Sequence, residues 1–213
     1  MEPNELADLA SVDLVLSTTR SVRRRLDFER PVAPELIEQC IDLATQAPTG
    51  IAAENWRFLV VISAERKRAL AELYRRALDL FESARGEPAK PAQRALADRL
   101  HEMPALILVC AEGRPPEGST PMQSAMQLGF YASILPAAWS LMLALRARGL
   151  GSTWTSLHLL YEKEAAELLG IPDGVTQTVL LPVAYMKGAV LKPAQRKRAG
   201  EVTFWDSWGT TRD

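Results

Sequence analysis

Residues 105–111 read Ala-Leu-Ile-Leu-Val-Cys-Ala, a short apolar run with no polar interruption. Such a run is typical of a strand that is buried on both faces of a sheet. Arg57–Ser63 and Val175–Tyr185 are similarly apolar and predict two further strands. Around them, helical spacing predicts helices over Pro34–Gln46, Ala64–Phe81 and Glu162–Leu169, and another charged helix that ends near Glu102. Helices that alternate with a few buried strands favour an α/β or α+β sandwich around one sheet.

The composition is that of an ordinary globular protein. Of the 213 residues, 47% are hydrophobic and 24% are charged, which excludes a disordered, fibrous or disulfide-stapled chain. Lys and Arg number 25 against 26 Asp and Glu, so the formal net charge of -1 lacks the basic field of a general nucleic-acid binder. Cys40 and Cys110 have no metal-site spacing, and we expect both thiols to be buried. The N-terminal residues do not have the pattern of a signal peptide, so we expect a cytoplasmic protein.

The most hydrophobic long segment is Gln123–Arg148. Its central part, Ala125–Leu145, is nearly long enough to cross a membrane, which takes about 20 apolar residues. Polar residues and a proline interrupt it, so we favour a helix buried in a core or a dimer interface and expect no membrane association. These interruptions are Gln127, Ser133, Pro136 and Ser140.

Several catalytic templates are missing from the sequence. It contains no P-loop, no GxGxxG after a strand, no HExxH and no GxSxG, and no Cys/His cluster that suits zinc. His101 precedes a helix end and reads as a capping or surface residue. His158 lies in an apolar context, where a hydrogen-bonded structural histidine is favoured over a catalytic one. We therefore expect neither hydrolytic nor metal-dependent chemistry.

Four local features each allow two interpretations. The basic run Thr18–Arg25 suits a phosphate, because guanidinium groups bind phosphate bidentately, but it is also typical of a solvated face. The turn Ala47–Gly50 leads into Trp56 and reads as a helix–strand connection. Small residues in Gly149–Ser156 let backbone approach a flat ligand, or simply cap and pack a helix. Arg196–Arg198 is, in isolation, a second solvated basic run.

Together and in this order, these features resemble the nitroreductase family of flavin-dependent oxidoreductases. The matching stretches are TTRSVRRRLDFERPV, APTG with NWRFLVV, ALRARGLGSTWTSLHLL, and LLPVAYMKG with KPAQRKRAGEVTFWD. They extend over about residues 13 to 208, which is nearly the whole chain.

The resemblance implies an α+β sandwich in which a mostly antiparallel sheet is flanked by helices. It implies one domain over residues 1–213 in an intertwined homodimer, with residues 186–213 as an arm that wraps the partner subunit. It also implies two FMN molecules at the subunit interface. The apolar helix Ala125–Leu145 would then be buried in the dimer.

The resemblance also implies cofactor-binding residues. Arg20, Ser21 and Arg23 match the motif that holds the FMN phosphate and ribityl chain, and Arg196 matches the basic residue that completes the phosphate site. A second group lies beside the isoalloxazine ring, where backbone N–H groups are expected to stabilise negative charge on the reduced flavin near N1 and O2. This group is Gly151, Ser152, Trp154 and Thr155.

The implied activity is hydride transfer from NADPH or NADH to FMN and then to a nitroaromatic, quinone or related small-molecule acceptor, in a ping-pong reaction. This chemistry demands no catalytic side chain, and we predict none. Phe130 and Tyr131 are candidates for the substrate side, or for packing.

One departure from the family pattern keeps other functions open. The turn Gly50–Trp56 carries Ala52 and Glu54 where the family commonly has Asn and Gln, so a flavin contact is lost or moves to Asn55. A carboxylate near the ring would also disfavour an anionic reduced flavin. The alternatives are a specialised relative, such as a dehydrogenase, a dehalogenase or a flavin-fragmenting enzyme, and a flavin-binding or degenerate protein without turnover.

Overall fold

The structure is a computed structural model that describes residues 8–50, 54–188 and 190–212. The described chain divides into two compact units. The larger is Thr19–Ala189, and the smaller combines Met1–Thr18 with Val190–Asp213. The predicted arm at residues 186–213 thus overlaps the smaller unit, and the single domain stays a prediction.

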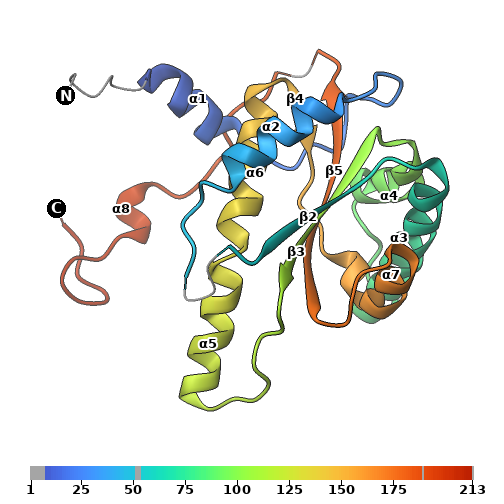
Figure 1. The fold of residues 1–213 in the computed structure, drawn as a ribbon. Helices are drawn as coiled ribbons and strands as arrows, with labels where there is room; N and C mark the ends of the chain where they lie inside the picture. The colour runs from blue at the N-terminus through green and yellow to red at the C-terminus, as the bar shows by residue number, and fades with distance from the viewer. Residues whose placement is uncertain (1–7, 51–53, 189, 213) are drawn as a thin grey trace, which may run out of the picture. The chain divides into compact units, whose positions relative to one another are not determined.

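A five-stranded sheet forms the centre of the larger unit (Figure 1). Its path runs β1-β5-β3-β2, and β4 also pairs with β5. All pairs between these strands are antiparallel, which confirms the predicted sheet of an α+β fold. The strands are β1 (Leu26–Asp27), β2 (Trp56–Val61), β3 (Ala105–Glu112), β4 (Leu150–Ser152) and β5 (Val175–Met186).

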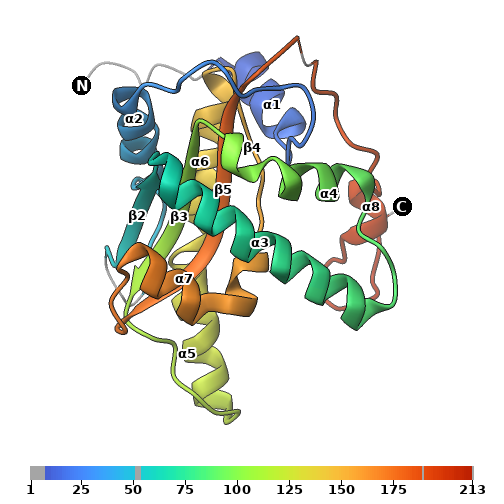
Figure 2. The same ribbon diagram turned by 90° about the vertical axis from the view of Figure 1, so that its right-hand side faces the viewer.

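Helices cover both faces of the sheet (Figure 2). On one face, Ile107 and Val109 of β3 pack in a core cluster with Cys40 and Leu141, because alternate side chains of a strand point to the same side. The helices on this face are α2 (Pro34–Ala44), which carries Cys40, and α6 (Leu135–Ala147), which carries Leu141. The other face carries α3 (Ala64–Arg85), α4 (Pro91–Asp98), α7 (Glu162–Leu169), and the 3₁₀ segments η1 (Leu100–Glu102) and η2 (Leu157–Tyr161).

The long apolar segment forms two helices, α5 (Pro121–Ala132) and α6. They separate at Ser133 and Ile134, just before Pro136, and the Ser133 hydroxyl donates to the Gly129 carbonyl at 2.9 Å. By length and composition, Pro121–Ala147 is still apolar enough to cross a membrane, and 44% of its most apolar window is buried. In contrast to α6, α5 buries none of its residues in the single chain.

The smaller unit contains α1 (Leu9–Thr18) and α8 (Ala199–Val202). After α8, the chain forms an aromatic turn in which the Phe204 and Trp208 rings lie 4.9 Å apart. The Arg212 guanidinium lies 3.5 Å above the centre of the Trp205 ring. Trp208 is 92% exposed, so this turn leaves large apolar surfaces uncovered.

Candidate functional site

Two of the predicted motifs, far apart in the sequence, are hydrogen-bonded to each other. The Val22 N–H donates to the Ser152 carbonyl at 2.9 Å, and the Thr153 hydroxyl donates to the Val22 carbonyl at 2.7 Å. The Trp154 N–H donates to the Ser21 hydroxyl oxygen at 3.1 Å. We call this contact between residues 21–22 and 152–154 the clamp. It brings the predicted phosphate motif and the predicted ring-side segment together within the larger unit.

Gly151 packs closely against the first motif and the end of the sheet. A Cβ atom at this position would lie 3.0 Å from Met186 Cγ, 3.1 Å from Val22 Cβ and 3.2 Å from Leu26 Cδ2. Real Cβ contacts are seldom so short, so the neighbours would have to move. The small size of Gly151 therefore serves internal packing.

The backbone amides that follow Gly151 donate inside the protein. Thr153 N–H bonds to the Pro182 carbonyl at 3.3 Å, Thr155 N–H bonds to the Leu180 carbonyl at 3.2 Å, and Trp154 N–H takes part in the clamp. Of the predicted ring-side group, Trp154 and Thr155 thus have amides that donate inside the protein, and the expectation that N–H groups of this segment stabilise a reduced flavin stays a prediction.

A tyrosine that the sequence did not single out joins this site. The Tyr74 hydroxyl on α3 is hydrogen-bonded to the Thr155 Oγ1 at 2.9 Å, and both residues are buried. Burial raises the pKa of Tyr74, whereas the Thr155 hydrogen bond and the positive charge of Arg23 act in the opposite direction. Arg23 is therefore within electrostatic reach of the Tyr74–Thr155 pair. From the sequence, Tyr74 can be predicted only as a residue on the apolar face of a helix. No local pattern predicts that its hydroxyl contacts Thr155.

The predicted arginines lie in different units. Arg20 is exposed and Arg23 is half-buried beside the clamp. Arg196 is exposed in the smaller unit, where it donates to the Gln195 carbonyl at 3.2 Å. The joining of Arg196 to the other two in one phosphate site stays a prediction.

The altered turn before Trp56 is described in part. Ala52 lies outside the described residues, whereas Glu54 is exposed with a left-handed φ of 54°. Asn55 is buried, and its Nδ2 donates to the Glu112 carbonyl at 3.1 Å. Its Oδ1 is buried without a hydrogen-bond partner among the described residues. The Asn55 side chain thus holds the turn to the end of β3 and retains one unused acceptor.

His158 is fully buried, as its apolar context predicts. The expected hydrogen bonds are missing, because neither ring nitrogen has a partner in the described part of the chain. Burial lowers the pKa of His158 to about 4, so the imidazole is neutral near pH 7. Cys40 and Cys110 are both free and buried, which confirms that prediction.

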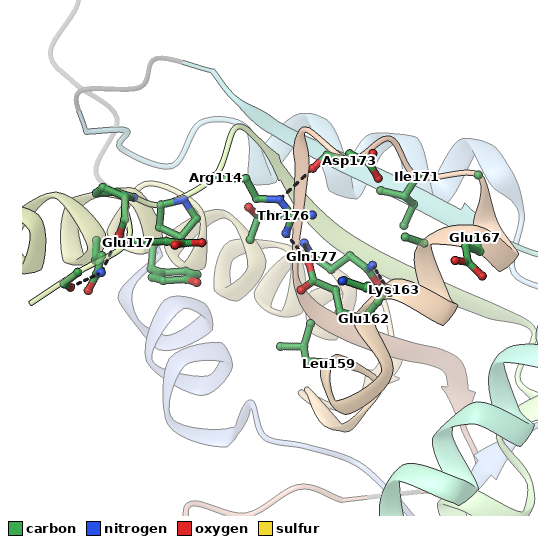
Figure 3. Close-up of a pocket in the computed structure, with 17 residues that line it drawn as sticks. Arg114, Glu117, Leu159, Glu162, Lys163, Glu167, Ile171, Asp173, Thr176 and Gln177 are labelled. Atoms are coloured by element: carbon green, nitrogen blue, oxygen red, sulfur yellow. Dashed lines mark hydrogen bonds and ion pairs between the residues drawn. The ribbon is translucent and has the colours of Figure 1, made fainter.

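A groove of about 1160 Å³ lies between the loop that follows β3, helix α5, helix α7 and the start of β5 (Figure 3). At its centre, Arg114 Nη1 lies 2.8 Å from Glu162 Oε1, and Gln177 Nε2 donates to the Glu162 carbonyl at 2.8 Å. Of the predicted site residues, only Tyr131 lines the groove. Phe130 packs against the core and meets the Tyr131 ring edge-on, with ring centres 5.5 Å apart.

The groove and the clamp lie at different places along β5. Ser152 pairs with Val183, whereas Gln177 of the groove is six positions earlier in the strand. At about 3.3 Å per residue, this separation is roughly 20 Å. The described residues therefore have two distinct polar regions. Of the predicted cofactor residues, Ser21, Ser152 and Trp154 belong to the clamp, Arg20, Arg23, Gly151 and Thr155 adjoin it in the sequence, and Arg196 lies in the smaller unit.

The chemistry of the clamp fits a phosphorylated cofactor that carries hydroxyl groups. Arg20 and Arg23 supply guanidinium donors, and the Ser21 oxygen accepts from Trp154, so its own proton can point toward a ligand. The partly exposed Trp154 adds an apolar surface that suits a flat ring. Among residues 8–50, 54–188 and 190–212, no group of three or more His, Cys, Asp and Glu side chains could hold a metal ion.

Comparison with known proteins agrees with this fit. A family model described as "Nitroreductase family" matches residues 16–185. The iodotyrosine deiodinase of Drosophila melanogaster is 31% identical over 194 residues, which are 86% of this chain and 65% of that protein. A putative NADH dehydrogenase/NAD(P)H nitroreductase of Archaeoglobus fulgidus is 26% identical over 81% of this chain and 84% of that protein.

Among solved structures, an oxidised iodotyrosine deiodinase bound to FMN and 3-iodo-L-tyrosine superimposes with a TM-score of 0.66. The match is 23% identical and covers 92% of this chain and 100% of that chain. At this identity the likeness concerns the fold. Because the family model covers most of the chain and the fold agrees with it, the protein belongs to the nitroreductase family of flavin oxidoreductases.

Proposed function

We propose that the protein is an FMN-dependent oxidoreductase that uses NADPH or NADH to reduce nitroaromatic, quinone or related small-molecule acceptors. The observation that carries this proposal is the clamp, because it unites the residues that match the phosphate motif and the ring-side motif of the family. When bound, FMN supplies the hydride chemistry at its ring, and the protein supplies binding and orientation.

The predicted site residues have separate tasks in this proposal. Arg20 and Arg23 neutralise the phosphate, and Ser21 donates a hydrogen bond to the phosphate or the ribityl chain. Arg196 is the further basic residue of the phosphate site. The ring-side residues Gly151, Ser152, Trp154 and Thr155 form the wall against which the flat ring is oriented. Phe130 packs against the core, and Tyr131 lines a groove that lies roughly 20 Å from the clamp within one chain, so in this proposal Tyr131 would reach the acceptor across the proposed dimer.

A homodimer is the proposed state of assembly. The support is helix α5, which buries no residue in the single chain and exposes Met122 and Leu128 by about 70% each. A second copy of the chain would cover such an apolar surface. We further propose a cytoplasmic protein without membrane or nucleic-acid partners, and analytical ultracentrifugation without detergent tests both the dimer and its solubility.

Reductive dehalogenation is a second candidate. Its support is the similarity to the Drosophila melanogaster deiodinase, which exceeds that to the Archaeoglobus fulgidus protein. The solved deiodinase with 3-iodo-L-tyrosine adds a precedent for this fold. Iodide release from 3-iodo-L-tyrosine by the reduced protein, compared with reduction of a nitroaromatic or a quinone, distinguishes the two reactions.

The first test is the visible spectrum of the purified protein under anaerobic conditions. Absorption bands at about 370 and 450 nm that bleach after addition of NADPH or NADH support a working flavin oxidoreductase. A flavin that is bound but not reduced by either donor would instead support a flavin-binding protein. A colourless protein that also fails to bind added FMN would contradict the proposal.

A further inference from the structure

The orientation of the Thr155 hydroxyl depends on a residue of another element. The Thr155 backbone forms two hydrogen bonds with Leu180. The Thr155 N–H donates to the Leu180 carbonyl at 3.2 Å, and the Leu180 N–H donates to the Thr155 carbonyl at 2.9 Å. Its side-chain oxygen is 2.9 Å from the Tyr74 hydroxyl, and Tyr74 and Thr155 are only 3% and 8% exposed. Water therefore has little access to the pair, and the two hydroxyls are hydrogen-bonded to each other, with either able to donate.

The chemistry of the two groups favours one direction for this hydrogen bond. A phenol is more acidic than an aliphatic hydroxyl and is the better donor. Burial raises the pKa of the Tyr74 phenol and the positive charge of Arg23 opposes this rise, but a phenol stays more acidic than the threonine hydroxyl. When the Tyr74 O–H donates to Thr155 Oγ1, the Thr155 proton has to point away from Tyr74. A threonine held in this way is an oriented donor for a third group.

We propose that Tyr74 is a positioning residue that fixes the Thr155 hydroxyl as a hydrogen-bond donor to the flavin ring. This inference rests on the proposed FMN function. The backbone amides of Trp154 and Thr155 already have acceptors, so a hydrogen bond from either of these two residues to the flavin has to come from a side chain. Because the reduced flavin is richer in electrons than the oxidised form, an oriented donor favours reduction. Tyr74 thereby raises the reduction potential of the bound flavin without contacting it.

The test compares FMN-loaded wild-type protein with Tyr74→Phe, Thr155→Val and the double variant. The midpoint potential is measured by anaerobic titration with reference dyes, and thermal unfolding is followed in parallel. Tyr74→Phe is expected to shift the ratio of oxidised to reduced flavin about tenfold toward the oxidised form, or about 30 mV for a two-electron couple. Thr155→Val should lower the potential at least as much, and the double variant no further than Thr155→Val alone.

Two further variants serve as controls. Thr155→Ser keeps the hydroxyl and should keep the wild-type potential. Tyr161→Phe removes a phenol from the neighbouring segment η2, where Tyr161 lies under the Arg76 guanidinium, 4.4 Å from the ring centre. It should leave the potential unchanged.

The possible outcomes separate the inference from the function on which it rests. If the wild type binds no FMN, the proposed function fails and this inference falls with it. If the wild type binds FMN but Tyr74→Phe lowers only the melting temperature, the pair is merely structural and the inference is overturned. Additive shifts in the double variant would also overturn it. If Tyr74→Phe does not fold, the comparison of Thr155→Val with Thr155→Ser takes its place. Equal midpoint potentials for these two variants would overturn the inference.

Discussion

The peptide N–H of Trp154 donates to the side-chain oxygen of Ser21, 3.1 Å away and 133 positions earlier in the sequence. This bond makes the phosphate motif and the ring-side motif one structural unit. Because a serine oxygen can accept and donate at the same time, Ser21 holds Trp154 and still has a proton for a ligand. A change that separates the two motifs should therefore affect both the stability of the fold and the retention of the cofactor.

Removal of Arg20 should weaken FMN binding. In Arg20→Ala, the phosphate loses a charge-assisted hydrogen bond worth about 1.5–3 kcal/mol, which raises the Kd for FMN roughly tenfold to hundredfold. Fluorescence quenching of FMN on titration with apoprotein measures this Kd. Arg24→Ala is the matched control, because it removes a neighbouring exposed arginine outside the predicted set.

Arg196→Ala tests the prediction for the smaller unit in the same assay. A similar loss of affinity is expected, because the resemblance assigns Arg196 to the same phosphate. Unchanged Kd values for both Arg20→Ala and Arg196→Ala would show that the phosphate site has been assigned to the wrong residues.

Gly151→Ala should destabilise the protein. The new Cβ would lie within 3.0–3.2 Å of Met186, Val22 and Leu26, and such overpacking costs about 1–3 kcal/mol of unfolding free energy. Urea denaturation measures the change. Gly174→Ala is the matched control, because an added Cβ there meets no atom within 4 Å. Equal unfolding free energies for the two variants would contradict the packing role of Gly151.

Much of the fold could be predicted because its main elements carry periodic or continuous apolar patterns. The strand predicted at residues 105–111 is β3, and the predicted helices at residues 34–46 and 162–169 are α2 and α7, with differences of a few residues at most. The end of α3 was predicted at Phe81, but the helix continues to Arg85 and ends at Gly86, which adopts a left-handed φ of 66°. Gly86 is the residue that ends this helix.

The site could be predicted only as far as local motifs reach. Ser21 and Trp154 were assigned to one cofactor on the strength of a resemblance, and the clamp brings them together. The Tyr74–Thr155 hydrogen bond could not be predicted, and neither could the absence of a hydrogen-bond partner for the His158 nitrogens among the described residues. Both depend on which elements pack against one another, and a side chain on an apolar helix face gives no sign of the group that it will meet. The hydrogen bonds of the Thr153 and Thr155 amides likewise depend on pairing with β5, and that of the Trp154 amide depends on Ser21.

The two cysteines should not react in the native protein. Burial raises the pKa of Cys110 to about 12 and also raises that of Cys40, so neither thiol ionises near neutral pH. Titration with Ellman's reagent at pH 8 should therefore find almost no thiol in the folded protein and both thiols in guanidinium chloride. Rapid reaction of a thiol in the native protein, at the rate seen in denaturant, would contradict the buried positions.

His158 should make stability depend on pH in a defined range. In the unfolded chain its pKa is near the ordinary value of 6.5, and in the folded protein burial lowers the pKa to about 4. Between these values the unfolded state binds more protons, so the unfolding free energy rises with pH. The contribution is full above about pH 6.5 and decreases by about 3 kcal/mol as the pH falls to about 4.

The measurement is urea unfolding at several pH values for the wild type and for His158→Leu. At pH 7 the variant should be about as stable as the wild type or more stable, because leucine removes two buried nitrogens that have no hydrogen-bond partner in the part of the chain that the structure describes. Between pH 6.5 and 4 the variant should lose less stability than the wild type, since the carboxylates titrate in both proteins and only the histidine differs. His101→Gln controls for the loss of a histidine outside the core and should follow the wild type. Parallel curves for wild type and His158→Leu over this range would mean that the buried imidazole takes up a proton in the folded protein as readily as in the unfolded chain.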